Sequence, residues 1–256
     1  MNARALDESV VLVTGATSGI GEAAARAFAA RGSRVVLSGR RAAAGEAATE
    51  CIRDEGGDAL FIRTDMNEDD QVRSLVEQTV DRYGRLDIAF NNAGIEGDPF
   101  TPLHESSLEN HERVFRTNVR SVLVSMQCEI PVMLENGGGA IINNASVAGL
   151  IGFPGLSSYV ASKHAVIGLT RSAALEYAPL GIRVNAVAPA VIETPMFDRL
   201  AAAGGEELRE RVLALHPVGR FGSPAEVAQA VVWLASPESS FVTGITVPVD
   251  GGFTAQ

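Results

Sequence analysis

The stretch "VTGATSGIGEAAARAF", residues 13–28, decides the fold of this chain. It begins at the end of a β-branched run, continues through Gly15, Gly19 and Gly21, and passes into an alanine-rich segment that favours a helix. Glycines after a strand permit a tight turn and a close approach of the backbone to phosphate, and the free N–H groups of the helix start attract anions. The spacing is G-x3-G-x-G and not the common G-x-G-x-x-G, so an ordinary glycine-rich turn is the alternative. We expect a dinucleotide to bind here.

The rest of the chain repeats this alternation of strand and helix. Apolar β-branched runs predict strands at 10–14, 34–38, 59–63, 86–90, 140–144, 182–188 and 246–250. Helices are predicted near 19–31, 41–55, 67–83, 106–134, 157–178 and 223–235. Apolar strands bracketed by helices indicate a parallel sheet that helices cover on both faces. We expect one doubly wound α/β domain of the Rossmann type over residues 1–256, with a substrate flap at about 190–216 over the carboxyl ends of the strands.

Composition narrows the class of ligand. Hydrophobic residues make up 46% and charged residues 20% of the 256 residues, and the net charge of −10 argues against nucleic acid and anionic membranes as partners. Apolar runs stay well short of the ~20 residues of a membrane span. The N-terminal segment lacks a signal layout, and Cys51 and Cys128 form no close motif, so we expect a cytoplasmic protein with reduced thiols and no metal site. A small molecule is the expected substrate.

The end of the second strand, "VVLSGRR" at residues 35–41, bears on the choice of cofactor. Many NAD sites place an acidic residue there to bind the ribose diol, and here Gly39 takes its place, followed by Arg40 and Arg41. An arginine is a planar donor suited to a 2′-phosphate. The sequence therefore favours NADP(H) over NAD(H), with Arg40 as the better candidate. The alternative is that both arginines lie on the solvated first turn of the next helix.

Six motifs in order resemble the short-chain dehydrogenase/reductase family, from about residue 8 to the C-terminus. They are "TGATSGIG" 14–21, "NNAG" 91–94, Asn118 in "RTNV", Ser146 in "NNASVAG", "YVASK" 159–163 and "VDGG" 249–252. The resemblance implies a seven-stranded doubly wound sheet and an assembly of identical subunits, either a dimer or, as we expect, a homotetramer. One departure is Pro189-Ala190, where the family often has Pro-Gly.

The resemblance also implies site residues. The tetrad would be Asn118, Ser146, Tyr159 and Lys163. Asn118 would hold a relay water, Asp65 would contact the adenine, and Ile192 and Thr194 would meet the nicotinamide amide. The full set of expected cofactor contacts is Gly15, Thr17, Ser18, Gly19, Ile20, Gly21, Arg40, Asp65, Met66, Asn92, Ala93, Gly94, Tyr159, Lys163, Pro189, Ile192 and Thr194.

Lys163 is the only lysine of the chain, and it lies four residues after Tyr159, on the same face of a helix. Ketone reduction needs a proton for the substrate oxygen. A phenol has a pKa of ~10, and a nearby cation favours its ionised form and so lowers that pKa. We therefore expect Tyr159 to be the general acid/base, with its pKa lowered by Lys163, and Ser146 to orient the substrate oxygen. Arginine is larger and always charged. It would therefore hold the groups of the site at the wrong distances, and it could not pass on a proton.

The identity of the substrate is the property that the sequence predicts least well. Candidate contacts are Glu96, Phe153 and Met196, and the mostly apolar loop residues favour a small, largely apolar ketone or secondary alcohol. One alternative is an NAD-dependent dehydrogenase of a cyclic diol or sugar, with Glu96 accepting a substrate hydroxyl. Another is a 3-oxoacyl carrier-protein reductase, which the lack of Arg and Lys at 129–140 and 176–182 disfavours. A catalytically idle dinucleotide sensor is disfavoured because the whole tetrad is present.

Overall fold

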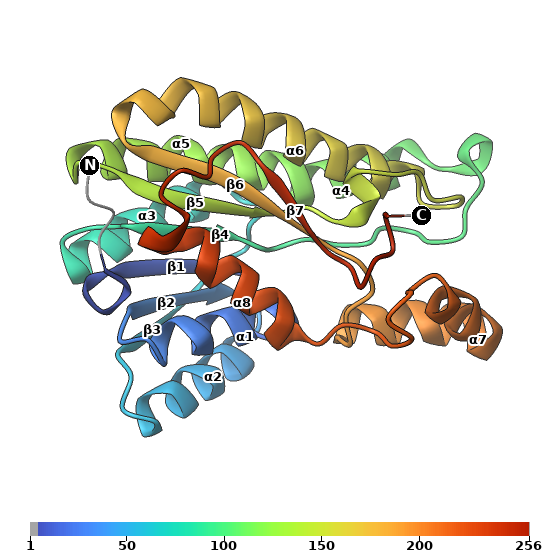
Figure 1. The fold of residues 1–256 in the computed structure, drawn as a ribbon, viewed down its shortest axis with the longest axis horizontal. Helices are drawn as coiled ribbons and strands as arrows, with labels where there is room; N and C mark the ends of the chain where they lie inside the picture. The colour runs from blue at the N-terminus through green and yellow to red at the C-terminus, as the bar shows by residue number, and fades with distance from the viewer. Residues whose placement is uncertain (1–4, 256) are drawn as a thin grey trace.

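The seven predicted strands join in one parallel sheet of order β3-β2-β1-β4-β5-β6-β7 (Figure 1). They are β1 (Val10–Thr14), β2 (Arg34–Gly39), β3 (Ala59–Arg63), β4 (Ile88–Asn91), β5 (Gly139–Asn144), β6 (Ile182–Pro189) and β7 (Thr246–Val249). This computed structural model describes residues 5–255, so the ends of the predicted domain, 1–4 and 256, lie outside the described residues. Strand order reverses between β1 and β4, and open α/β sheets bind ligands at such a switch point. The predicted seven-stranded Rossmann-type fold is confirmed.

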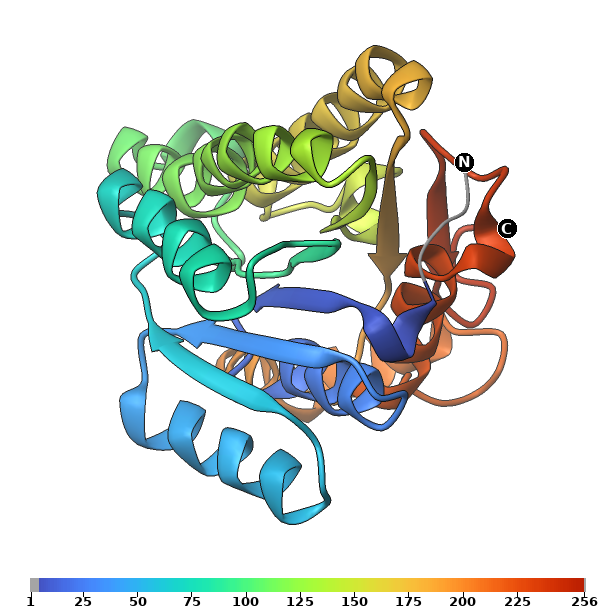
Figure 2. The ribbon, with the colours of Figure 1, turned by 90° about the vertical axis from the view of Figure 1, so that its left-hand side faces the viewer.

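Helices cover both faces of the sheet (Figures 1 and 2). The eight α-helices among the described residues are α1 (Gly19–Ala29), α2 (Ala42–Asp54), α3 (Asp69–Tyr83), α4 (Leu108–Phe115), α5 (Ser121–Glu135), α6 (Ser157–Tyr177), α7 (Pro195–Ala214) and α8 (Pro224–Ala235). Alternate residues of β1 point to opposite faces, so Val11 and Val13 pack in the core under α1, α2 and α8, while Leu12 packs in the core under α3, α5 and α6. None of the described helices is both long enough and apolar enough to cross a membrane.

The single helix expected over 106–134 is interrupted. A π-helical segment at Arg116–Arg120 separates α4 from α5, and it contains the buried Asn118. A π-turn inserts an extra residue into the helical repeat and so turns side chains away from their regular positions. The chain is helical from Leu108 to Glu135, so the predicted helix is confirmed, and its irregular turn falls on a predicted site residue.

The segment predicted as a flap follows β6 at the carboxyl edge of the sheet. It forms α7, which Thr194 caps by accepting a hydrogen bond from the Phe197 amide at 3.4 Å. The helix is kinked at Gly205, where φ is 73°. It projects beside the body of the molecule, and Phe197 is the residue of α7 that is buried (Figure 1). Its action as a flap stays a prediction.

Candidate active site

The glycine turn after β1 is in direct contact with the "NNAG" turn after β4. Asn92 Nδ2 donates to the carbonyl oxygens of Thr14 and Gly15, at 2.9 and 3.2 Å. A Cβ atom at Gly21 would lie 2.5 Å from Asn92 Nδ2 and from Gly15 O. Such distances exclude any side chain, so glycine is required for the packing of these turns. Gly15 itself has φ 65°.

The start of α1 has the features of a phosphate site. The side chain of the N-cap residue, Ser18, accepts no hydrogen bond from the helix, so the first N–H groups of α1 remain free to donate to an anion. Thr17 and Ile20 flank this turn and are half-buried. A Cβ atom at Gly19 would lie 3.1 Å from Thr194 Cγ2, so the end of the predicted nicotinamide loop reaches the same place. The residues present therefore fit a dinucleotide.

Arg41, and not Arg40, lies over this turn. Its guanidinium donates to Thr17 Oγ1 at 2.9 Å and to Ser18 Oγ at 2.6 Å. The side chain of Arg40 is exposed and makes no hydrogen bond within the described part of the chain. The carbonyl of Arg40 accepts a hydrogen bond from Arg63 Nε at 3.3 Å, so the Arg63 guanidinium lies at the end of β2. Which of the two arginines contacts a 2′-phosphate stays a prediction.

Asp65 and Met66 follow β3 at the same edge of the sheet. Asp65 Oδ1 accepts hydrogen bonds from the backbone and side-chain amides of Asn67, at 3.0 and 3.1 Å. Met66 is buried in the core that α3, α5 and α6 cover. The structure thus places Asp65 on an ordered turn, while its contact with adenine stays a prediction.

Two tetrad residues are held by the backbone of neighbouring loops. Lys163 is 4% exposed and its Nζ donates to the carbonyl of Asn144, the last residue of β5, at 2.7 Å. Asn118 Oδ1 accepts from the amide of Ile95 at 2.8 Å, and its Nδ2 donates to the carbonyl of Ile95 at 2.9 Å. A Cβ atom at Gly94 would lie 3.3 Å from Asn118 Oδ1 and 3.6 Å from Lys163 Nζ. The "NNAG" turn therefore touches the tetrad as well as the glycine turn.

Tyr159 and Ser146 face each other. Burial raises the pKa of Tyr159 to about 12, a hydrogen bond with Ser146 lowers it, and the nearby charge of Glu96 raises it. Burial lowers the pKa of Lys163 to about 8, and its Nζ lies 5.6 Å from the Tyr159 ring centroid. In this structure the Lys163 ammonium donates to the Asn144 carbonyl, and its expected lowering of the Tyr159 pKa stays a prediction. At neutral pH the phenol carries its proton.

The predicted nicotinamide loop runs from the end of β6 into α7. Pro189 O accepts a hydrogen bond from Ser146 Oγ at 3.4 Å, and the buried Ile192 pairs with Gly222 as an isolated parallel bridge. Among the described non-glycine residues only Phe100 has a positive φ, so Ala190, in place of the family's glycine, carries no such strain. The departure from Pro-Gly is accommodated.

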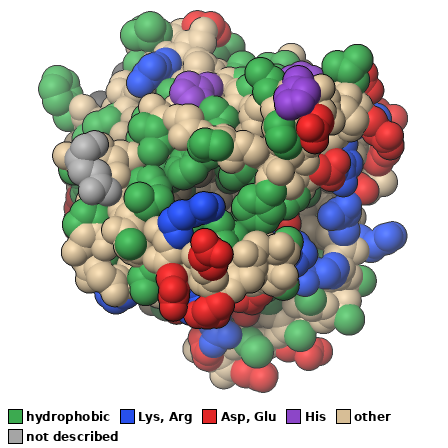
Figure 3. Space-filling model, turned by 90° about the vertical axis from the view of Figure 1, so that its right-hand side faces the viewer, with side chains coloured by type: hydrophobic (Ala, Val, Ile, Leu, Met, Phe, Trp, Pro, Cys, Tyr) green, Lys and Arg blue, Asp and Glu red, His purple; other side chains and the backbone are tan. Residues whose placement is uncertain are grey.

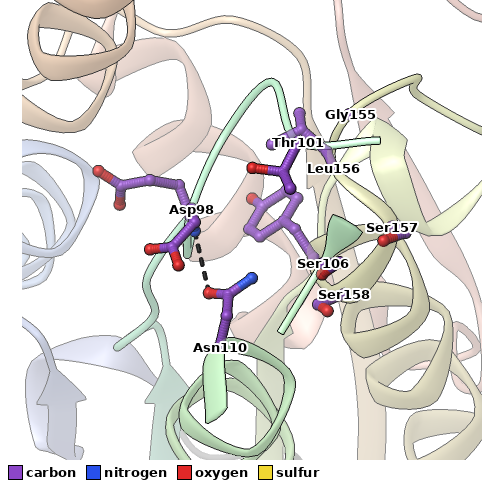
Figure 4. Close-up of a pocket in the computed structure, with 10 residues that line it drawn as sticks. Asp98, Thr101, Ser106, Asn110, Gly155, Leu156, Ser157 and Ser158 are labelled. Atoms are coloured by element: carbon purple, nitrogen blue, oxygen red, sulfur yellow. Dashed lines mark hydrogen bonds between the residues drawn. The ribbon is translucent and has the colours of Figure 1, made fainter. Parts of the chain in front are cut away.

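A recess opens beside Tyr159, between the loop after β4 and the start of α6 (Figure 4). Its lining residues are Glu96, Asp98, Thr101, Ser106, Asn110, Gly155, Leu156, Ser157, Ser158 and Tyr159. Of the predicted substrate contacts only Glu96 is among them. Phe153 instead packs against Phe253, with ring centroids 5.8 Å apart, and Met196 lies half-buried on α7. The lining of this recess is mostly polar, and the apolar substrate contacts stay a prediction.

Sequence reasoning did not find the ion pair at this recess. Arg199 of α7 donates from Nε and Nη2 to the two carboxylate oxygens of Glu96, at 2.8 and 3.1 Å. The two residues are 103 positions apart, so no local pattern could pair them. Figure 3 shows the end of the molecule that carries α7, where charged side chains border an apolar area. No cluster of three or more His, Cys, Asp or Glu side chains that could hold a metal occurs among the described residues.

Comparison with known proteins gives concordant results. The family model described as enoyl-(acyl carrier protein) reductase matches residues 15–254. Cyclohexanol dehydrogenase of Acinetobacter sp. (strain SE19) is 43% identical over 98% of this chain and 96% of its own length. The 2,5-dichloro-2,5-cyclohexadiene-1,4-diol dehydrogenase of Sphingobium indicum (strain DSM 16412 / CCM 7286 / MTCC 6364 / B90A) is 43% identical over 98% of both chains. The crystal structure of levodione reductase superposes with a TM-score of 0.93 at 35% identity, over 97% of this chain and 98% of the other.

Proposed function

Because the chain belongs to the short-chain dehydrogenase/reductase family, we propose that it transfers a hydride between NADP(H) and a small secondary alcohol or its ketone. The nicotinamide, when bound, supplies or accepts the hydride. The observation that carries the proposal is the position of Tyr159, whose phenol lies close enough to Ser146 for that hydroxyl to lower its pKa, and whose ring centroid lies 5.6 Å from Lys163 Nζ. A phenol in this setting would serve as the proton donor to a substrate oxygen.

The chain's own residues would move the proton and hold the oxygen. Ser146 would orient the substrate oxygen towards the phenol, as a fixed donor does for a developing negative charge. Tyr159 would donate its proton during reduction and accept one during oxidation. Lys163 and Asn118, both buried beside Gly94, would carry the proton onward after Tyr159 has given it up.

We propose NADP(H) as the preferred cofactor, with Arg41 and Arg40 both near the 2′-phosphate. The support is the absence of an acid at Gly39 and the position of Arg41 across Thr17 and Ser18. A charge-assisted hydrogen bond contributes about 1.5–3 kcal/mol, so NADPH should bind roughly tenfold to a hundredfold more tightly than NADH. Dissociation constants from fluorescence quenching test this without a substrate. Arg41→Ala should remove most of the difference, and equal affinities in the unchanged protein would refute the preference.

A cyclic diol is a second candidate substrate class, with NAD(H) as its cofactor in the alternative stated above. The carboxylate of Glu96 near Tyr159 supports this candidate, because it can accept a hydrogen bond from a second substrate hydroxyl. The names of the two curated relatives, for a cyclic alcohol and a cyclic diol, support a ring substrate. Initial rates with cyclohexanol, cyclohexanone and cyclohexanediols, each with either cofactor, would separate the candidates. Turnover only of a 3-oxoacyl carrier protein would refute both.

We also propose that the chain works as a homotetramer in the cytoplasm. Phe241, Trp233 and Ile245 leave apolar surface exposed near the edge strand β7, where a second copy could cover it. Cys51 and Cys128 are both free, as in a reducing compartment. Light scattering at micromolar concentration should give four times the mass of the chain, and a monomer would refute the assembly.

A further inference from the structure

Arg199 of α7 does not line the recess itself, but it is paired with Glu96, which does. Arg199 holds both oxygens of the Glu96 carboxylate, and its Nη1 donates to the carbonyl of Pro195 at 3.1 Å. The side chain of Glu96 is 14% exposed, against 59% for Arg199. The carboxylate therefore lies inward, on the recess side, and the guanidinium closes it off from the solvent side.

The paired carboxylate keeps capacity to accept further hydrogen bonds. An ionised carboxylate has about four lone-pair sites on its two oxygens, and each oxygen uses one of them for Arg199. The remaining lone-pair sites of the carboxylate accept hydrogen bonds, and the carboxylate cannot donate one. A substrate hydroxyl can donate a hydrogen bond to these sites, whereas a carbonyl or a second carboxylate cannot.

We propose that Arg199 is a specificity-determining residue of the flap, which positions Glu96 to accept a second hydroxyl of a cyclic diol or hydroxyketone bound at Tyr159. This inference rests on the proposed function. Glu96 and Tyr159 line the same recess, together with the hydroxyl-bearing Thr101 and Ser158. Two oxygen functions of one ring would then meet Tyr159 and Glu96 at the same time.

The charge balance gives Arg199 a second, independent effect. The charge of Glu96 raises the pKa of Tyr159, so Glu96 acts on the phenol through space. Arg199 offsets that charge at contact distance. Without Arg199 the carboxylate acts uncompensated, and Tyr159 should lose its proton only at higher pH.

The test compares kcat/KM for cyclohexanol and for cyclohexanediols in the unchanged protein, Arg199→Gln, Arg199→Lys and Glu96→Gln. The unchanged protein should prefer a diol by about tenfold to a hundredfold, as a hydrogen bond to a charged group predicts. Arg199→Gln and Glu96→Gln should lose most of this preference, mainly through KM. Arg199→Lys should keep part of it, because it keeps the charge but not the two-pronged contact.

Arg220→Gln is the matched control. Arg220 pairs in the same two-pronged way with Glu226, at 2.7 and 3.0 Å, and its side chain is 61% exposed, but the pair is absent from the lining of the recess. It should leave the substrate preference unchanged. The pH dependence of alcohol oxidation supplies the second readout: Arg199→Gln should shift its alkaline limb to higher pH, and Arg199→Gln with Glu96→Gln should not.

The outcomes separate the two proposals. Oxidation of cyclohexanol and of the diols with equal kcat/KM, unchanged in Arg199→Gln, would overturn the role of Arg199 and leave the proposed function standing. An absence of turnover with every secondary alcohol and ketone in the unchanged protein would overturn the proposed function itself. A diol preference that survives Arg199→Gln but not Glu96→Gln would also overturn the role of Arg199.

Discussion

The ammonium of Lys163 donates its hydrogen bond to the backbone carbonyl of Asn144, at 2.7 Å, and not to the phenol of Tyr159. Asn144 is the last residue of β5, so the position of Nζ is set by the sheet. The lysine is buried and is not among the causes of the shift in the pKa of Tyr159. In this structure Lys163 thus places a buried positive charge under the "NNAG" turn.

Lys163→Arg should lower kcat by about a hundredfold or more, the range of an impaired proton transfer. Arginine keeps the charge but is planar and larger, and Lys163 is 4% exposed, so the larger group would have to fit a buried position. Steady-state rates with a secondary alcohol measure the effect. The thermal midpoint by circular dichroism controls for folding, and a variant that turns over within threefold of the unchanged protein would contradict the role.

Alcohol oxidation should speed up with pH well beyond neutrality. Burial raises the pKa of Tyr159 to about 12. As long as the pH is below that value, each rise of one pH unit makes the phenolate that accepts the proton tenfold more abundant. Reduction uses the protonated phenol, which is fully populated at neutral pH. Ser146→Ala should move the oxidation limb to higher pH, because the hydrogen bond from Ser146 lowers the pKa. An oxidation profile that is flat above pH ~7 would disagree with this assignment.

Glu129→Gln should stabilise the protein at neutral pH and remove a pH dependence. Glu129 is fully buried on α5, accepts one hydrogen bond from Asn91 Nδ2 at 3.1 Å, and its Oε1 has no partner in the described part of the chain. Burial raises its pKa from 4.5 to about 8. The unfolded chain therefore releases this proton near pH 4.5 while the folded chain keeps it, so stability falls as pH rises from about 4.5 to 8.

The slope expected from this single group is at most about 1.4 kcal/mol per pH unit. Urea unfolding at a series of pH values from about 5 to 8 measures it in both proteins. The difference in unfolding free energy between Glu129→Gln and the unchanged protein should grow with pH. A constant difference would mean that Glu129 is ionised in the folded protein at all these pH values.

Gly94→Ala should reduce activity more than stability. The added methyl group would press on Asn118 Oδ1 and lie close to Lys163 Nζ, two groups of the tetrad. Gly152→Ala is the control, since its Cβ would meet no described atom within 4 Å and the residue lies in the loop before α6. We expect a tenfold or larger drop in kcat for Gly94→Ala alone. Equal rates for the two variants would show that the turn can shift away.

The sequence predicted the sheet well because each strand is an apolar run between helices. The boundaries of β1 and β3 agree to the residue, and the other strands differ by one or two positions. The tetrad and the glycine turn could be named because their residue types recur at fixed spacings. These signals come from residues that are close together in the sequence, so the sequence alone is enough to detect them.

The remaining features depend on contacts between distant segments. The π-helical turn at Asn118 follows from its fit against Ile95, which local helix propensity does not register. The contacts of Arg41 with Thr17 and Ser18 join residues more than 20 positions apart, so no local pattern displays them. The polar recess joins the loop after β4 to the start of α6, so its chemistry emerges only when these segments meet.

The attachment of α7 has a consequence for how such proteins diversify. The helix starts at the Thr194 cap, packs Phe197 against the ring of Phe221 with the guanidinium of Arg209 over both rings, and otherwise leaves its residues outside the core. Exchange of this segment for one of another length or sequence would disturb little of the sheet or the tetrad. New substrate ranges can therefore arise by replacement of one surface helix, while the proton-transfer groups remain as they are.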